Sequence, residues 1–453
     1  MSIDIRNNTE LYDVARLFFG DDCPSITLDN FGDEFTVKIN EASYRNIYTD
    51  ERYNIIPRER RVGRLSKIAL YDALNVFTGR VMPWGALTGV RPTKLFYECL
   101  RANKTIEQAE NIMRNVYRVS AERANVLKRI ICAQRGKVEF SPEFYNLYVH
   151  VPYCTTRCNY CSFVSAPIGK CAEQAKQYVD LLVDEISRSR EKLSACGKKV
   201  LSVYIGGGTP TALDPKSFEK LLCALDGFDC EYTCEAGRPD TVTPEKIDIM
   251  KAHGVTRVCV NPQTLNDKTL ALIGRNHGTD DFYRVYDEVK SHGFVINCDL
   301  IAGLDGETTN DFINSYEGVK KLAPHNLTVH SLSKKNGSAI RYRDGENADA
   351  SQMLEYVLNN LGEYEPYYLY RQKRQAGNLE NVGLFLQDFQ CVNNITTMEE
   401  TVGVMACGAG AISKFIAGGN IYRFANMRDV NLYISRYDEK IPAKLDYFSK
   451  VGL

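Results

Sequence analysis

The stretch YVHVPYCTTRCNYCSF, residues 148–163, joins a strand-like alternation to three closely spaced cysteines. Apolar and polar residues alternate in its first half, as they do in a half-buried strand. Pro152 then ends the alternation, and Cys154, Cys158 and Cys161 follow at intervals of four and three residues. The sequence therefore predicts a strand that leads directly into a loop carrying three thiols.

Five more strand-like segments follow this one, with helical patterns between them. They are VLSVYI from Val200, CEYTCEA from Cys230, TRVCVN from Thr256, FVINCDLIAG from Phe294 and NLTVHSL from Asn326. Repeated strand–helix units form parallel sheets. Six strands with their helices on one side make an open barrel rather than a closed eight-stranded one. We therefore predict an α/β fold, an open six-stranded (βα)6 partial TIM barrel, over residues 144–335.

The segments on either side of this barrel have a different pattern. Residues 1–143 contain two strand-like segments and then mainly helical sequence, which predicts an N-terminal α+β domain without an assigned role. Residues 336–453 mix a basic loop, a helix and an aromatic run, which predicts a mixed α/β extension that covers the substrate. The length of 453 residues agrees with two or three domains.

The cysteine spacing has three interpretations. It matches one apolar face of a helix packed in a core, although Pro152 and the polar residues between the cysteines disfavour a helix. It also suits zinc, which however prefers four ligands in paired units. A four-iron cluster takes thiolate ligands, and three of them leave one iron open to a substrate or cofactor. The iron–sulfur interpretation is favoured.

A glycine-rich segment, VYIGGGTPTAL, follows the second predicted strand at residues 203–213. Glycines leave backbone N–H groups bare and allow a polar ligand to approach closely, although such a run is also a common turn. The segment has neither the G-x-G-x-x-G nor the G-K-[ST] pattern of phosphate-binding loops. Both motifs follow strands of the predicted barrel, where active sites of such folds lie.

Together, the two motifs resemble the radical S-adenosylmethionine (SAM) superfamily over residues 146–335. The resemblance implies one [4Fe-4S] cluster whose open iron chelates SAM, with Cys154, Cys158 and Cys161 as the ligands. In that superfamily, one electron from the cluster cleaves SAM to methionine and a 5′-deoxyadenosyl radical, and the glycine strip contacts the methionine part.

YVHVPYC, VNPQTLND, LIGRNH and NCDLIAGL are similar to strings of one branch, the oxygen-independent coproporphyrinogen III oxidases (dehydrogenases). The resemblance implies a set of cofactor contacts: Tyr148, Tyr160, Gly207, Gly208, Thr209, Glu235, Gln263, Arg275, Asp299 and Ser333. Of these, Arg275 suits the methionine carboxylate, Glu235 its ammonium and Asp299 the ribose hydroxyls. His150 suits either a catalytic proton role or a packed, hydrogen-bonded histidine.

Two long strings outside the barrel, PWGALTGVRPTKL at 83–95 and YYLYRQKRQAGNLENVG at 367–383, resemble a sub-branch with an extra N-terminal domain. Their basic residues Arg91, Lys94, Arg371 and Lys373 would suit a substrate that bears four propionates. Alternatively, RPTK is a turn with an exposed cap, and the tyrosines belong to a core. The chain departs from the better-studied branch at Phe163, where that branch has one more cysteine.

Composition narrows the classes of protein that remain. The net charge near −1 disfavours a nucleic-acid or membrane binder. Fifteen cysteines, an odd number, and the absence of a basic-then-apolar start favour the reducing cytoplasm over a disulfide-bonded secreted protein. No stretch approaches the roughly 20 apolar residues of a membrane-spanning helix.

The leading functional prediction is an oxidoreductase of haem biosynthesis that decarboxylates propionates of coproporphyrinogen III to give protoporphyrinogen IX. Its expected partners are the tetrapyrrole substrate and a low-potential electron donor such as flavodoxin or ferredoxin. One alternative is a haem-binding or trafficking protein that keeps the cluster. The His-Asn-x-x-Tyr-Trp motif of haem chaperones is absent, since the one tryptophan is Trp84. Another alternative is a radical SAM enzyme that acts on RNA.

Overall fold

The computed structural model describes residues 2–89, 91–163, 165–333, 348–372 and 379–451. The chain divides into two compact units. The N-terminal unit contains Met1–Ala133 together with Leu369–Glu380, and the barrel unit contains Gln134–Tyr368 with Asn381–Leu453. The predicted boundaries at 143 and 335, and the covering role of the last segment, stay predictions.

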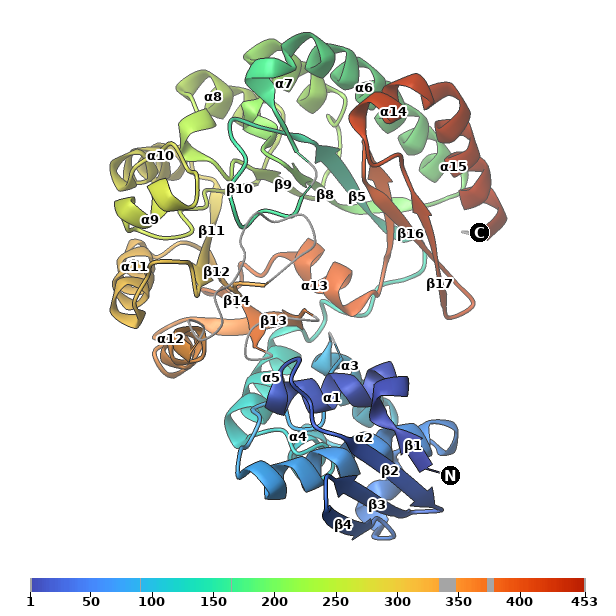
Figure 1. Cartoon of the computed structure of the whole chain (residues 1–453). Helices are drawn as coiled ribbons and strands as arrows, with labels where there is room; N and C mark the ends of the chain where they lie inside the picture. Colours follow the sequence, from blue (N-terminus) through green and yellow to red (C-terminus); the bar gives the residue numbers. More distant parts are fainter. Residues whose placement is uncertain (1, 90, 164, 334–347, 373–378, 452–453) are drawn as a thin grey trace. The chain divides into compact units, whose positions relative to one another are not determined.

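A four-stranded antiparallel sheet and five helices form the N-terminal unit (Figure 1). The strands are β1 (Ser2–Asp4), β2 (Ile26–Phe31), β3 (Glu34–Ile39) and β4 (Ala42–Ile47). The helices are α1 (Thr9–Phe19), α2 (Arg58–Thr78), α3 (Pro92–Arg101), α4 (Ile106–Asn115) and α5 (Ala121–Ala133). Alternation along β3 buries Phe35, Val37 and Ile39, so that one face of the sheet carries a core. This confirms the predicted α+β fold.

Six parallel strands form the centre of the barrel unit, as predicted. In spatial order they are β5 (Phe144–Val151), β8 (Lys199–Gly207), β9 (Glu231–Glu235), β10 (Arg257–Cys259), β11 (Val295–Ala302) and β12 (Asn326–Ser331). All six are largely buried and rich in β-branched and aromatic residues, as expected of a sheet covered on both faces. The sheet stays open, which confirms the predicted α/β partial barrel.

Helices follow the strands and line the outer side of the curved sheet (Figure 1). They are α6 (Ala172–Ala195), α7 (Pro215–Cys223), α8 (Pro244–Ala252), α9 (Asp267–Leu272), α10 (Thr279–Ser291), α11 (Thr309–Leu322) and α12 (Ala348–Asn359). Local sequence fixes their first residues: Thr243 caps α8, whose first residue is Pro244, and Thr308 and Asp311 form a capping box on α11.

The C-terminal part of the chain extends the sheet at both edges. Strand β15 (Gly403–Cys407) pairs in parallel with β5, and β16 (Ile412–Ala417) and β17 (Asn420–Ala425) continue that edge antiparallel. At the other edge, β14 (Glu380–Phe385) pairs antiparallel with β12, and β13 (Glu365–Arg371) lies beyond it. In the described part of the chain the sheet therefore has 11 strands, five more than the barrel core.

Helix α13 (Val392–Glu399) closes the amino-terminal end of the barrel strands. Glu231, the first residue of β9, accepts hydrogen bonds from the N–H groups of Val392 and Asn393 at 3.1 and 3.0 Å. The Asn146 amide near the start of β5 donates to the Thr396 hydroxyl at 2.8 Å. Since α13 covers this end, the opposite, carboxyl-terminal end is the one that is available for a ligand.

A buried carboxylate joins the C-terminal segment to α6. Glu185 and Lys444, from helix α15 (Tyr437–Val451), are both fully buried and form an ion pair of 2.5 Å. The Gly408 N–H, the Asn426 amide and the Tyr433 hydroxyl also donate to Glu185, at 2.8, 2.8 and 2.6 Å. These contacts hold α15 and the segment after β15 to the outer surface of the barrel. None of the helices that the structure describes has the length and apolar character needed to cross a bilayer.

Candidate functional site

The three cysteines lie on a loop that begins where β5 ends. Cys154 belongs to the short strand β6 (Tyr153–Cys154), and its sulfur lies 3.3 Å from the hydroxyl of Thr209, which follows β8. Cys158 is buried, and the Arg238 guanidinium donates to its sulfur at 3.5 Å. The Cys161 N–H donates to the Cys158 carbonyl at 3.1 Å. The loop therefore brings its thiols against residues from the carboxyl ends of two other strands.

The last residue of α9 and the two residues after it anchor this cysteine loop. The Thr156 hydroxyl donates to the Gly274 carbonyl at 2.9 Å. Asn159 donates twice, from its N–H to the Ile273 carbonyl at 3.0 Å and from its side chain to the Leu272 carbonyl at 2.8 Å. Three successive carbonyls thus hold the polar residues between the cysteines, which explains why this segment is a fixed loop rather than a helix.

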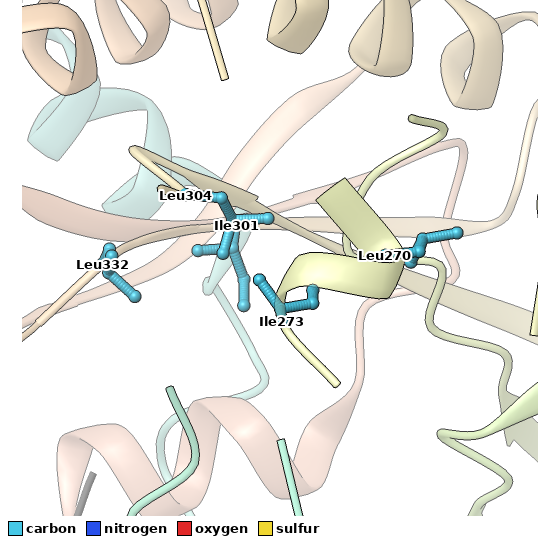
Figure 2. Packing of buried hydrophobic residues seen from close by; sticks show 5 residues of the cluster. All are labelled: Leu270, Ile273, Ile301, Leu304 and Leu332. Carbon is cyan, nitrogen blue, oxygen red and sulfur yellow. The ribbon is translucent and has the colours of Figure 1, made fainter. Parts of the chain in front are cut away.

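Tyr160, within the same loop, packs against a buried apolar cluster at the carboxyl ends of β11 and β12. Figure 2 shows the five residues of this cluster: Leu270, Ile273, Ile301, Leu304 and Leu332. Burial raises the pKa of the Tyr160 phenol, and the nearby Arg275 guanidinium opposes the shift. The phenol therefore keeps its proton at neutral pH and remains a hydrogen-bond donor inside the site.

The electrostatics of the thiols suit a cationic metal cluster. Burial raises the pKa of Cys154, the Thr209 hydroxyl opposes this, and the charges of Cys161 and Cys158 raise the pKa further. Cys154 is thus close enough to the other two sulfurs for their charges to disfavour its thiolate, and iron favours the thiolate by binding it. No three His, Cys, Asp or Glu side chains among the described residues surround a single-metal position. In a four-iron cluster each thiolate binds a different iron, so no such convergence is required.

Close packing explains the glycines after β8. Gly207 has a φ of +110°, and a Cβ there would lie 2.4 Å from the His150 ring. A Cβ on Gly208 would lie 2.4 Å from the Tyr153 carbonyl oxygen, which accepts the Thr209 N–H at 2.7 Å. Both positions therefore require glycine because of protein neighbours, whether or not a ligand also contacts the strip.

His150 is buried on β5, and its ring occupies the space beside Gly207. Burial lowers the pKa of His150 to about 4, although a hydrogen bond with the backbone of Ala409 opposes the shift. The imidazole is therefore neutral at physiological pH, as in a packed histidine. A catalytic proton role for His150 stays a prediction.

Glu235, at the end of β9, forms a hydrogen-bonded pair with Tyr204 of β8. The Tyr204 hydroxyl donates to the carboxylate at 2.6 Å, and the Tyr148 ring stacks on Tyr204 with 6.2 Å between centroids. Burial raises the pKa of Glu235 to about 7, the Tyr204 hydrogen bond opposes this, and Asp299 adds to the increase. A carboxyl group poised near neutrality ionises readily beside a cation, so its environment suits the ammonium group of an amino acid.

Gln263, after β10, has a strained backbone. Its φ is +69°, and its amide oxygen is buried without a hydrogen-bond partner in the described chain. Its N–H donates to the Asp299 carbonyl and its carbonyl accepts the Ile301 N–H, both at 3.0 Å, which holds this conformation against β11. Left-handed backbone in a non-glycine residue and an unsatisfied buried acceptor are both typical of ligand sites.

Asp299 and Ser333 lie on or just after the next two strands. The Asp299 carboxylate accepts a hydrogen bond from Asn297 at 2.9 Å and lies 3.7 Å from Nε2 of His330 on β12. The Ser333 hydroxyl is buried and, among the described residues, has no hydrogen-bond partner. Together with Gln263, these residues leave polar atoms along the ends of three neighbouring strands.

Arg275 lies beneath the cysteine loop rather than in solvent. It is buried, and its guanidinium donates to the carbonyls of Asn261 at 2.6 Å and Gly237 at 3.2 Å. It also interacts with the Tyr160 hydroxyl and the Cys158 thiol. The guanidinium therefore links the cysteine loop to the ends of β9 and β10. Arg275 is a buried residue of the site and not an exposed helix cap.

Sequence reasoning missed a second buried arginine. Arg238, in the segment after β9, forms an ion pair of 3.0 Å with Asp240 and donates to the Thr156 hydroxyl at 3.0 Å as well as to the Cys158 sulfur. Burial favours the neutral form of Asp240, but the nearby His277 ring and the hydrogen bonds from Arg238 hold its pKa well below the usual range. The available signal was position, because GRPD follows the third strand just as the other site segments follow theirs.

The four basic residues predicted to bind propionates do not form one described site. Arg91 and Lys94 line a cavity within the N-terminal unit. Arg371 is buried in that unit and donates to the Leu87 carbonyl at 2.7 Å. Lys373 lies outside the described residues.

The fold and the cysteine loop define a class of protein, and comparison with known proteins agrees. Residues 148–318 match the Radical SAM superfamily. The chain is 35% identical over 402 residues to the oxygen-independent coproporphyrinogen-III oxidase-like protein HemZ of Bacillus subtilis, which covers 84% of this chain and 80% of that protein. The chain belongs to this family of oxygen-independent coproporphyrinogen-III oxidase-like radical SAM proteins.

Two further relatives are more distant. The heme chaperone HemW of Lactococcus lactis is 29% identical over 305 residues, covering 63% of this chain and 73% of that protein. The solved structure of coproporphyrinogen III oxidase (HemN) from Escherichia coli superposes with a TM-score of 0.54 at 23% identity, covering 68% of this chain and 72% of that one. The latter establishes a shared fold.

Membership of this superfamily brings a [4Fe-4S] cluster and SAM as cofactors. The residues of this chain fit both groups. Three thiols on one loop, whose charges act on Cys154, suit the cluster. The Glu235 carboxyl and the unsatisfied Gln263 and Ser333 oxygens suit a polar organic cofactor.

Proposed function

We propose that this radical SAM enzyme oxidatively decarboxylates propionate side chains of coproporphyrinogen III to vinyl groups, giving protoporphyrinogen IX without oxygen. One observation carries the proposal: the 35% identity to HemZ spans 84% of the chain and so extends well beyond the superfamily domain at residues 148–318. The name of that relative, and of the HemN structure that shares the fold, points to coproporphyrinogen.

In this proposal, Cys154, Cys158 and Cys161 ligate the cluster, and the residues at the strand ends hold SAM. When bound, the two cofactors supply the one-electron chemistry that removes a hydrogen atom from the substrate. Glu235 accepts the ammonium group, because a cation beside this buried carboxyl opposes the burial that raises its pKa to about 7.

Arg275 and Asp299 serve the other ends of SAM in this proposal. The two carbonyls that bind Arg275 fix the orientation of its guanidinium, so that its remaining N–H groups face a carboxylate without loss of side-chain entropy. Asp299 accepts ribose hydroxyls, and its bond from Asn297 keeps the carboxylate in place. Tyr148, Tyr160, Gly207, Gly208, Thr209, Gln263 and Ser333 complete the proposed contact set.

The remaining parts of the proposal concern the surroundings of the reaction. Residues 336–453 cover the substrate, a flavodoxin or ferredoxin supplies electrons, and the protein works in the cytoplasm. A closed site matters because it keeps the radical away from solutes that would react with it. Support for a reducing compartment comes from the 15 cysteines, all of which are free thiols in the structure.

An anaerobic product assay tests the substrate assignment. Reconstituted protein is incubated with coproporphyrinogen III, SAM and dithionite, and the products are oxidised and separated by chromatography. We expect protoporphyrin, with the three-propionate intermediate at short times. If SAM is cleaved to 5′-deoxyadenosine while no vinyl product forms, the substrate is a different molecule.

A haem-binding or trafficking role is the second candidate, and the 29% identity to HemW supports it. The two functions are separated by titrating the reconstituted protein with haem. Stoichiometric binding at submicromolar haem, together with no turnover of coproporphyrinogen III, favours trafficking. Weak haem binding in a protein that forms vinyl groups favours the oxidase.

A further inference from the structure

A cavity with a basic lining lies within the N-terminal unit, the part of the chain whose role is unassigned. Its volume is about 350 Å³, which lies in the range of small-molecule pockets. Helix α2, the segment before α3 and the start of α3 supply its walls. The cationic lining residues are Arg60, Arg64, Lys67, Arg91 and Lys94.

The lining of this cavity carries more positive than negative charges. Glu98 is the single acidic residue among the five cations of the lining. Its carboxylate binds Arg60 at 3.0 Å and Arg64 at 2.7 Å, while Arg64 also donates to the Tyr117 hydroxyl at 3.1 Å. Glu98 therefore orients two guanidinium groups, and Glu10, outside the lining, pairs with Lys67, so these two carboxylates neutralise at most two of the five charges.

Lys94 adds a cation at the first turn of α3. Its side chain is exposed, and within the described residues no ion pair or hydrogen bond occupies its ammonium group. The backbone at the start of α3 adds partial positive charge, because this helix begins at Pro92 without a side-chain cap. Both features favour an anion on the same side of the cavity.

One wall of the cavity is rigidly supported from behind. Arg371 is fully buried, donates to the Leu87 carbonyl at 2.7 Å and lies over the Trp84 ring at 5.3 Å. Trp84 in turn donates to Glu380 at 2.6 Å, and Glu380 pairs with Arg123 at 2.5 Å. This buried network fixes residues 84–87, so the cavity has a preorganised shape, which lowers the entropic cost of binding.

The remaining lining is apolar or aromatic and includes Ile68, Leu87, Leu95 and Tyr117. A lining that combines cations with apolar surface matches a ligand that has anionic groups on a partly apolar body. We infer that this cavity binds a small organic anion with at least two negative charges, carried by phosphate or carboxylate groups. This inference is independent of the proposed function, since every lining residue belongs to the N-terminal unit.

Calorimetric titration of the full-length, cluster-loaded protein tests the inference. The phosphate probes are inorganic pyrophosphate and adenosine diphosphate, and the carboxylate probes are tricarballylate and citrate. Sodium chloride at matched ionic strength controls for nonspecific screening. We expect one chemical class to bind at one site per chain, with an affinity that weakens as salt is added. The class that binds identifies the source of the anion.

Matched variants place the binding in this cavity. Lys94→Ala and Arg60→Ala each remove one lining cation and should weaken binding about tenfold, while Lys94→Glu should abolish it. Lys104→Ala and Arg58→Ala remove exposed cations of the same unit that do not line the cavity, and should leave the affinity unchanged. The melting temperature without ligand should be the same for all five variants.

Either of two results would overturn the inference. The first is that none of the four probes binds more tightly than sodium chloride does at the same ionic strength. The second is that a probe binds, but Arg58→Ala and Lys104→Ala weaken it as much as Arg60→Ala and Lys94→Ala do. That result would show diffuse attraction to a basic surface rather than a site.

Discussion

Cys158→Ala tests the proposed ligand set at the level of a single residue. Two remaining thiolates cannot hold the cluster, so anaerobically reconstituted protein should lose the broad thiolate-to-iron absorption and most of its iron and sulfide. The same holds for Cys154→Ala and Cys161→Ala. Cys223→Ala, at an exposed cysteine outside the loop, is the control and should keep wild-type iron content. Full iron content in Cys158→Ala would refute the ligand assignment.

Arg238→Gln tests the hydrogen bond to the Cys158 sulfur. A positive donor beside a cluster ligand stabilises the reduced, more negative form. Its loss should make the reduction potential of the cluster more negative, as followed by a redox titration with electron paramagnetic resonance. Iron content should be unchanged, which separates this effect from loss of the cluster. A potential equal to that of the wild type would show that Arg238 acts only through its ion pair with Asp240.

Glu235→Gln tests the raised pKa of the buried carboxyl. An acid whose pKa rises from 4.5 to about 7 on folding adds stability below pH 4.5, and that stability is lost as pH rises toward 7. The apoprotein should therefore lose stability to urea between pH 5 and pH 7.5, and the glutamine variant should lose less. The difference in stability between the two proteins should change most by pH 7.5, where the variant is more stable relative to the wild type than it is at pH 5. Parallel pH profiles would contradict the shift.

Some of these residues were readable from the sequence and others were not. The spacing of the three cysteines predicted them as ligands, and the position of Glu235 at the end of a predicted strand placed it at the site. The left-handed backbone of Gln263 has no sequence signal, because it depends on hydrogen bonds to Asp299 and Ile301. The contact of Arg238 with Cys158 joins residues far apart in the chain, and local patterns do not encode such contacts.

At the scale of elements, the glycine strip after β8 packs closely against β5 and β6. Gly208→Ala puts a methyl group against the Tyr153 backbone, which cannot move like a flexible side chain, and should cost about 1 to 3 kcal/mol of unfolding free energy. The added methyl group should also displace β6 and weaken SAM binding. Addition of SAM should then change the cluster's paramagnetic resonance signal less than in the wild type. Gly169→Ala, at an open position with ordinary φ, should change stability by less than about 0.5 kcal/mol. Equal effects of the two substitutions would show that the strip is not tightly packed.

Local patterns predicted the six core strands but not the elements that complete the sheet. The former alternate with amphipathic helices, and that pattern is visible within any short window. The strands β15, β16 and β17 lie in GVMACGAGAISKFIAGGNIYRFA, where glycines and short runs give no clear period. The place of β15 beside β5 is set by pairing between distant segments, which sequence windows do not contain.

For the molecule as a whole, the buried Glu185 links the C-terminal segment to the barrel through an ion pair and three further hydrogen bonds. Glu185→Ala leaves the Lys444 ammonium buried without a counterion and should cost about 3 to 5 kcal/mol of unfolding free energy. Asp180→Ala is a control on the same helix, because Asp180 pairs with Lys220 in solvent and should contribute less than about 1 kcal/mol. Urea denaturation of both variants measures the difference. A loss in Glu185→Ala as small as in the control would mean that the segment docks through other contacts.

The parallel pairing of β15 with β5 also has a consequence for synthesis on the ribosome. Residues 145–149 emerge early, whereas their partners at 403–407 emerge near the end of translation. During that interval β5 has one unpaired edge, and such an edge attracts other nascent chains. Production of this protein should therefore depend on chaperone supply, and C-terminal truncations before residue 403 should aggregate rather than yield a smaller working enzyme.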